Sequence, residues 1–346
     1  MSAGETPDFV IVGENVHTTR VIRRGAASLV AGADGDEAIA FTDEHGESRL
    51  LPIDDAERAT QEYEEGRVKH VRTAVRQAMD GGAGAEAAVA YLRAMALAQA
   101  EAGARFIDVN VDEFSIKLDE QIEAIRWLVA LLGPVSPVPL SIDSSNLEII
   151  VAGIEAADAG AGPPMLNSAS LERIEALDVA VAAGGPVIVT AAGDEGMPED
   201  AQQRVDNASR IIEAALAKGI PLERMYVDPL VFPISVDGDF GEHCLAAIRE
   251  LRERYGPEIH ITGGMSNVSF GLPNRRLIND AFLILAIDAG ADSGIIDPLT
   301  NPPERALGLD RGARPVQLAL DVLSGADRYC RAYMKAYRAG ELEMAA

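Results

Sequence analysis

Short apolar runs alternate along the chain with longer stretches in which apolar residues recur at helical spacing. The short runs are continuous, which is typical of strands buried on both faces of a parallel sheet. Eight runs of this kind occur along the sequence: Phe9–Val12, Arg105–Val109, Val138–Ile142, Pro164–Leu166, Val187–Thr190, Met225–Val227, Ile259–Thr262 and Ser293–Ile296.

Helical stretches follow most of these runs and provide the crossover connections that parallel strands require. They are Leu118–Leu132, Leu147–Ala159, Leu171–Ala183, Ala201–Lys218, Glu242–Arg254 and Leu277–Ala289. Eight strand–helix units predict a closed (β/α)8 TIM barrel, and an open doubly wound sheet is the alternative.

Two regions depart from this rhythm. Residues 25–80 are acidic and rich in Gly and predict an insertion after the first strand, with a hairpin of Glu37–Thr42 and Ser48–Pro52 and then a helix from about Ala56 to Met79. Residues 316–346 predict two helices that extend the barrel domain of residues 1–315. This extension either closes the barrel or forms the interface of a homodimer.

Composition restricts the class of protein. A net charge of −25 disfavours binding to nucleic acid or to anionic membranes. The two cysteines form no CxxC motif, the N-terminus is acidic and polar, and no apolar run approaches the ~20 residues of a membrane span. We therefore expect a soluble cytoplasmic protein.

Polar residues stand at the carboxyl ends of the predicted strands, where β/α barrels carry their active sites. They are Glu14, Asn15, His17, Asp108, Asn110, Asp143, Asn167, Asp228, Asn267 and Asp297. We expect no positive charge at these ends, no nucleophile–base pair and no metal site. Carboxylates and amides together favour a neutral ligand rich in N–H donors, such as a pterin, over a phosphate.

Each of these residues also has a purely structural explanation. Asp143 begins a sequence that can cap the following helix, and Asp228 and Asp297 each precede a proline and can open a turn. Asn267 can bridge backbone groups at a bend, as Asn167 can, and a single histidine such as His17 is usually structural. Their recurrence at equivalent positions of successive units favours a shared site.

Six motifs carry a resemblance to a known family: IVGENVH (11–17), FIDVNV (106–111), SIDSSN (141–146), MLNSAS (165–170), YVDPLVFP (226–233) and GGMSNVSFGLPNRRLIND (263–280). Over residues 9–24 and 85–300 the chain resembles the pterin-binding methyltransferases. The resemblance is to the methyltetrahydrofolate:corrinoid/iron–sulfur protein methyltransferases and, more distantly, to the folate domain of cobalamin-dependent methionine synthase. It implies a barrel of the dihydropteroate-synthase type.

The resemblance also implies a function and a site. The substrate would be tetrahydrofolate or 5-methyltetrahydrofolate, and a separate corrinoid (cobalamin) protein would be the partner, with the direction of methyl transfer open. Pterin-binding residues would be Asp143, Asn167, Asp228, Asn267 and Glu14, and catalytic residues would be Asn267, Asp108 and Asn110. Further candidates are His17, Ser266 and Asp297. The chain has no cobalamin motif of its own, since Ser48 stands where the DxHxxG-like pattern from Asp43 requires Gly.

The sequence departs from the family at three places. Gly13–His17 reads Gly-Glu-Asn-Val-His where Gly-Glu-Arg-Ile-Asn is usual, Phe270 replaces Gln, and Asp112-Glu113 replaces Gly-Pro. These departures put the identity of the corrinoid partner in question.

Three rival functions are considered. Dihydropteroate synthase would need a Ser-Thr-Arg segment and a Ser-Arg-Lys type motif, where this chain has Asp112–Ser115 and Met265–Ser269. The other rivals are a pterin-binding protein without catalysis and a metal-dependent aldolase-like barrel.

Overall fold

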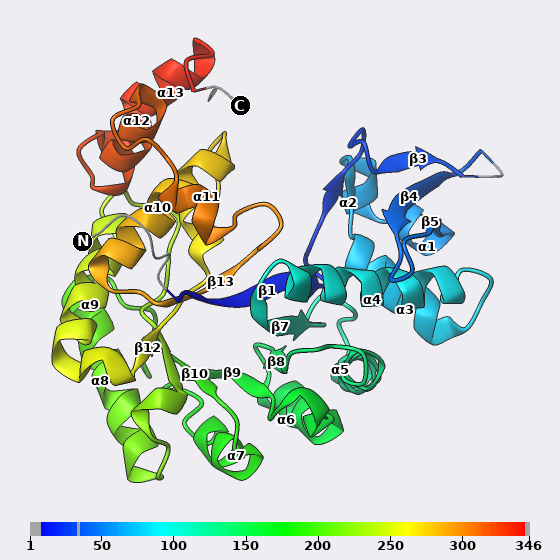
Figure 1. Cartoon of the computed structure of the whole chain (residues 1–346), viewed down its shortest axis with the longest axis horizontal. Helices are drawn as coiled ribbons and strands as arrows, with labels where there is room; N and C mark the ends of the chain where they lie inside the picture. Colours follow the sequence, from blue (N-terminus) through cyan, green and yellow to red (C-terminus); the bar gives the residue numbers. More distant parts are fainter. Residues whose placement is uncertain (1–7, 33–34, 343–346) are drawn as a thin grey trace. The chain divides into compact units, whose positions relative to one another are not determined.

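The computed structural model describes residues 8–32 and 35–342 (Figure 1). Residues 1–7 lie outside the described residues, so the expectation that they form no signal peptide stays a prediction. By its contacts the chain divides into two compact units, residues 13–167 and residues 1–12 with 168–346.

The fold is an eight-stranded parallel β/α barrel, as predicted. Its strands follow the order β12-β11-β10-β9-β8-β7-β1-β13. Their bounds are β1 Val10–His17, β7 Ala104–Asn110, β8 Leu140–Asp143, β9 Met165–Ala169, β10 Val187–Thr190, β11 Met225–Asp228, β12 His260–Ile261 and β13 Ser293–Ile296. Beyond β12, Gly264 forms a parallel bridge to Ile295 of β13, which links the two ends of the strand order.

The register of the strands aligns polar residues with one another. In residues 13–167, Asn110 of β7 is paired with Asp143 of β8, and Asp143 is paired with Asn167 of β9. In the other unit, Thr190 of β10 is paired with Asp228 of β11. Each of these residues lies at or near the carboxyl end of its strand, where a parallel barrel presents side chains to ligands.

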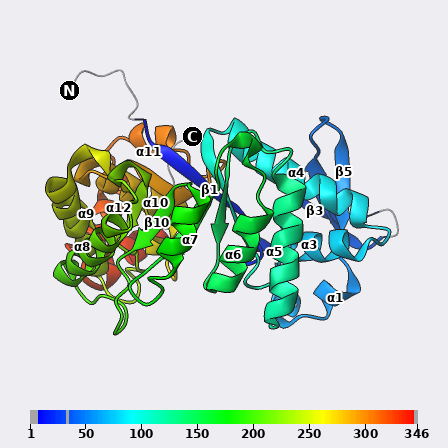
Figure 2. The ribbon, with the colours of Figure 1, turned by 90° about the horizontal axis from the view of Figure 1, so that it is seen from below.

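Helices cover the strands within each unit. In residues 13–167, α4 (Ala85–Glu101) and α5 (Leu118–Leu132) pack on β7, and α6 (Leu147–Ala156) packs on β8. Figure 2 shows α5 and α6 side by side. The prediction for α5 is confirmed at both ends, whereas α6 ends before the predicted Ala159, which begins the short 3-10 helix η1 (Ala159–Ala161).

The other unit contains the remaining helices of the barrel and the C-terminal segment. They are α7 Ala176–Ala183, α8 Ala201–Ala217, η2 Leu222–Arg224, α9 Phe240–Tyr255, η3 Gly256–Glu258, η4 Met265–Ser269, α10 Arg275–Ala289, α11 Pro303–Leu307, α12 Arg314–Leu323, η5 Arg328–Cys330 and α13 Arg331–Arg338. The start of α7 was predicted too early, because Leu171–Glu175 form turns. The two C-terminal helices are confirmed, and α12 packs on α10. The domain boundary at residue 315 stays a prediction.

The insertion contains a small antiparallel sheet of β3 (Leu29–Ala31), β4 (Glu37–Thr42) and β5 (Ser48–Pro52). The predicted hairpin is confirmed at both strands. The single helix predicted from Ala56 to Met79 is wrong. The chain instead forms α1 (Asp55–Arg58), α2 (Gln61–Glu64), β6 (Arg67–Val68) and α3 (His70–Asp80), and β6 pairs with β2 (Ile22–Arg23).

Side-chain capping explains why this helix is divided. Asp54 accepts the N–H of Glu57 at 2.8 Å, and Thr60 accepts that of Tyr63 at 3.3 Å, so each begins a new helix. Glu57 is fully buried and accepts the N–H of Lys69 at 2.7 Å. A continuous helix would use that N–H within its own backbone ladder.

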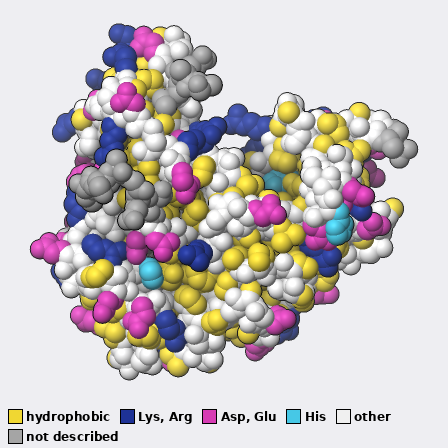
Figure 3. All heavy atoms as spheres, in the orientation of Figure 1, with side chains coloured by type: hydrophobic (Ala, Val, Ile, Leu, Met, Phe, Trp, Pro, Cys, Tyr) yellow, Lys and Arg dark blue, Asp and Glu magenta, His cyan; other side chains and the backbone are white. Residues whose placement is uncertain are grey.

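Charged side chains of both signs are interspersed over the face of the molecule in Figure 3. Among the described residues, no helix combines the length and apolarity needed to cross a bilayer. Cys244 and Cys330 are both buried and free.

We expect Glu57→Ala to destabilise the insertion by roughly 3 kcal/mol. Glu57 also binds the guanidinium of Arg72 at 2.9 Å, and its removal leaves that largely buried charge with only the longer 3.9 Å contact to Glu62. Hydrogen exchange over residues 22–68 and denaturant unfolding measure the effect. As a control, Glu86→Gln removes an ion pair whose carboxylate is 85% exposed and should change stability by less than about 0.5 kcal/mol. Equal effects of the two substitutions would contradict the role of Glu57.

Candidate functional site

The last residue of β1 and a residue near the end of β7 form a hydrogen-bonded pair. His17 Nε2 lies 2.8 Å from Asp108 Oδ2, and the carboxylate of Asp108 is almost fully buried. Asn167 of β9, two strands away from β7, donates from Nδ2 to the other oxygen of Asp108 at 3.2 Å. Two candidates, from β1 and β9, therefore converge on the carboxylate of a third, Asp108 of β7.

A second pair lies beside the first. Asn110 donates from Nδ2 to Asp143 Oδ2 at 2.8 Å. Burial, together with the neighbouring charge of Asp108, raises the pKa of Asp143 well above its usual value, although His17 and Asn110 act in the opposite direction. A buried carboxyl group with a raised pKa readily takes up a proton or accepts hydrogen bonds from a ligand.

The capping explanation is confirmed for the segment that begins at Asp143, but not for Asp143 itself. Helix α6 is capped by Asn146, whose Oδ1 accepts the N–H of Glu148 at 2.8 Å. The loop before it is held by Asp112, which accepts from the Ser144 hydroxyl at 2.5 Å. Asp143 therefore takes no part in the cap, and its carboxylate is directed to other partners.

Glu14 does not belong to this cluster of pairs but to an ion pair at the end of β1. Arg20 donates to Glu14 Oε1 at 3.2 Å and to Asn15 Oδ1 at 2.7 Å. The expectation that no positive charge lies near the strand ends is therefore wrong at the first strand. The pairing also satisfies part of the Glu14 carboxylate, so its predicted contact with a pterin stays untested.

In the other unit, Asp228 and Asn267 flank the dipeptide Gly263–Gly264. A Cβ atom on Gly264 would lie 2.8 Å from Asn267 Nδ2, and one on Gly263 would lie 3.1 Å from Asp228 Oδ1. Gly263 also has a φ of 159°, close to the limit of the region that side chains avoid. The two glycines thus give these two polar side chains the space that they occupy.

Asp228 and Asp297 also have the predicted turn role. Asp228 Oδ1 accepts the N–H of Leu230 at 2.7 Å, and Asp297 Oδ1 accepts that of Leu299 at 3.0 Å. Burial raises the pKa of Asp228 to about 6. Ser266 lies in η4 beside Asn267, and its carbonyl accepts a hydrogen bond from Arg275 at 2.9 Å.

One group of described residues has the spacing to hold a metal ion. His17, Asp108 and Asp143 each offer an atom within 4.8 Å of the others. Binding an ion there would break the hydrogen bond between His17 and Asp108. The expectation of no metal stays a prediction.

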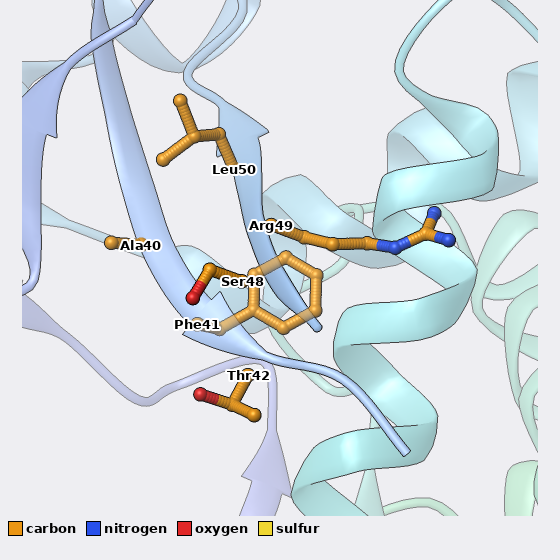
Figure 4. Close-up of a pocket in the computed structure, with 6 residues that line it drawn as sticks. All are labelled: Ala40, Phe41, Thr42, Ser48, Arg49 and Leu50. Atoms are coloured by element: carbon orange, nitrogen blue, oxygen red, sulfur yellow. The ribbon is translucent and has the colours of Figure 1, made fainter. Parts of the chain in front are cut away.

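A shallow hollow of about 290 Å³ lies on the insertion hairpin, and it is separate from all predicted site residues (Figure 4). Phe41 and Leu50 are among the side chains that line it. Arg49 extends from this hairpin and pairs with Asp43 at 2.7 Å and with Glu86 at 2.8 Å. Its charge is thus paired within the insertion and with α4 of the barrel.

The site can now be compared with known proteins. The sequence pattern of the family described as "Pterin binding enzyme" matches residues 73–297, from α3 to the residue after β13. The chain belongs to this family. The predicted resemblance and the prediction that the chain is an enzyme are both confirmed.

Two relatives narrow the comparison. A methylcorrinoid:tetrahydrofolate methyltransferase of Eubacterium limosum is 32% identical over 73% of this chain and 89% of its own length. A methionine synthase of Mycobacterium tuberculosis is 29% identical over 61% of this chain, but the match spans only 19% of that longer protein.

Solved structures agree on the fold. A dihydropteroate synthase of Xanthomonas albilineans superposes with a TM-score of 0.50 at 25% identity, over 64% of this chain and 82% of that one. One from Stenotrophomonas maltophilia gives 0.51 at 22% identity, over 64% and 85%.

Two residues of the site were missed from the sequence. Arg20 follows the strand by three residues, and its spacing from Glu14 was the available signal. Asp112 was noticed only as a departure from the family, yet it organises the loop after Asp143.

We expect Asp143→Asn to stabilise the ligand-free protein. The raised pKa means that the folded state disfavours the ionised carboxyl of Asp143. The loss of folding stability therefore grows as pH rises from the pKa of Asp143 in the unfolded chain to its pKa in the folded protein. The gain in free energy of unfolding over the wild type should be on the order of 1 kcal/mol or more near neutral pH and smaller near pH 4. Thermal unfolding across this pH range measures it. The exposed Asp119→Asn is the control, and a gain that is independent of pH would contradict the prediction.

We expect Gly264→Ala to displace the amide of Asn267, because the new Cβ would meet Nδ2 at 2.8 Å. The turnover rate of the enzyme should fall by about tenfold or more, since small misplacements of groups at the reacting centre lower the rate strongly. Gly82→Ala is the matched control, because nothing lies within 4 Å of that Cβ position. Steady-state kinetics decide, and equal rates for both variants would remove this constraint on Asn267.

Proposed function

We propose that the protein transfers a methyl group between N5 of tetrahydrofolate and the cobalt of a corrinoid carried by a separate protein. The observation that carries the proposal is the paired arrangement of Asn110, Asp143 and Asn167 on three adjacent strands. The 32% identity to a methylcorrinoid:tetrahydrofolate methyltransferase supports it and favours tetrahydrofolate as the methyl acceptor.

The pterin would be held through its pyrimidine edge. That edge has an amino group and a ring N–H, which one ionised carboxylate can accept together. We assign this role to Asp143, with Asn167 and Asp228 as the further pterin residues. In Asp228 the turn uses Oδ1, so Oδ2 would accept from the ligand.

N5 would be contacted by Asn267. When the methyl group leaves N5, the electron pair of the C–N bond stays on nitrogen. This nitrogen is a poor leaving group, so a proton or a strong hydrogen bond must reach N5 as the C–N bond breaks. The Asn267 amide can donate to N5 or accept from it. Asp108 and Asn110 would complete the hydrogen-bond network.

We also propose that a separate corrinoid protein is the partner, that the enzyme forms a homodimer and that it is located in the cytoplasm. The relative's name supports a corrinoid as the methyl donor. A pterin-binding protein without catalysis is the alternative, because the same carboxylates and amides would serve binding alone.

Anaerobic assays with free cobalamin test the proposal. Calorimetry should show that the protein binds 5-methyltetrahydrofolate. The absorbance of cob(I)alamin should fall as the methyl group of the folate is transferred to it. Binding without transfer would favour the non-catalytic alternative. Failure of the protein to bind the folate would overturn both.

We expect Asn267→Ala to retain folate binding and to lower the rate of methyl transfer by about 100-fold. The amide acts where charge develops on N5, so its loss affects the transition state more than the bound substrate. Stopped-flow absorbance of cob(I)alamin and calorimetry measure the two quantities. Gln202→Ala, an exposed amide on α8, is the control. An unchanged rate for Asn267→Ala would remove this residue from the reaction.

A further inference from the structure

His17 stands out among the candidates because it is a titratable group joined to a buried carboxylate. Its side chain is 15% exposed, and its Nε2 lies 2.8 Å from Asp108 Oδ2. Its imidazole can exchange a proton near neutral pH, which the amides of the site cannot do.

We propose that His17, held by Asp108, carries the proton that N5 of the folate gains or loses during methyl transfer. The inference rests on the proposed function and extends it, because no group was assigned there to exchange this proton.

The hydrogen bonds around Asp108 define how His17 is used. One carboxylate oxygen accepts from Asn167 and the other lies against His17, so Nε2–H of the imidazole is the donor to Asp108. Nδ1 then carries the lone pair of the neutral ring. A carboxylate behind one ring nitrogen orients the imidazole and stabilises the cation that forms when the other accepts a proton.

The surrounding charges favour the same chemistry. Carboxylates face His17 from three strands, namely Glu14 on β1, Asp108 on β7 and Asp143 on β8. Arg20 is the nearby cation and is engaged by Glu14. Burial lowers the pKa of His17, but the hydrogen bond and charge of Asp108, with the other two carboxylates, outweigh it, so the pKa is raised from its usual range.

The proton balance is complete in both directions. When tetrahydrofolate accepts the methyl group, the N5 lone pair forms the N–C bond and the cobalt–carbon electron pair stays on cobalt, reducing Co(III) to Co(I). N5 then loses its proton to Nδ1 of His17. In the opposite direction Co(I) attacks the methyl carbon, the N–C pair returns to N5, and the imidazolium of His17 protonates it.

The direction toward folate therefore requires the neutral imidazole. Its rate should rise with pH as His17 loses its proton and then reach a plateau. The test follows cob(I)alamin formation from methylcobalamin and tetrahydrofolate, under anaerobic single-turnover conditions, between about pH 5.5 and pH 9. Saturating folate keeps binding from shaping the profile.

We expect His17→Asn to lower the plateau rate by about 100-fold and to remove the inflection, while calorimetric folate binding is retained. Asp108→Asn should keep an inflection but move it to lower pH, because it replaces a charged partner with a neutral one. His45→Asn is the matched control, since His45 lies in the turn of the insertion hairpin with its side chain 72% exposed. This control should leave rate and profile unchanged.

An independent measurement follows the protons directly. Nuclear magnetic resonance of the histidine ring carbons in the folate-free enzyme should show His17 titrating above the usual histidine range, and at lower pH in the Asp108→Asn variant. A His17→Asn variant with an unchanged rate and profile would overturn the role of His17 alone. A wild-type enzyme that binds folate but transfers no methyl group would overturn the proposed function and this inference together.

Discussion

The carboxylate of Asp108 is the point on which the rest of the polar site depends. It is buried at the end of β7 and joins side chains from β1 and β9, through His17 and Asn167. A buried carboxylate is tolerated only where hydrogen bonds and counter-charges replace water. The register of the parallel strands places Asn110, Asp143 and Asn167 at one level beside it, so the second polar pair lies close to the first.

The barrel was predictable because its signals are local. Val187–Thr190 and Ser293–Ile296 are buried strands with the predicted bounds, and Leu118–Leu132 is a helix with the predicted bounds. These segments have clear apolar patterns and are flanked by glycine or polar turns. Burial and periodicity therefore predict the same strands and the same helix. The insertion hairpin was predictable for the same reason, since Gly46 lies in the turn between two short strands.

The failures arose where a side chain competes with the backbone. The helix predicted after Ala56 is divided because Asp54 and Thr60 cap short helices and Glu57 takes the N–H of Lys69, a contact across twelve residues. Such a contact has no signature in the helical periodicity. In the site, the sequence identified the residues that end the strands but not their pairing, and it did not identify Arg20 as the partner of Glu14.

The raised pKa values of Asp143 and Asp228 have a consequence for how the enzyme responds to its surroundings. A buried carboxyl group with a raised pKa must lose its proton before it can accept the N–H donors of a heterocycle, so ligand occupancy and pH are linked. Under the proposed function, acidification would therefore weaken folate binding without any change of shape.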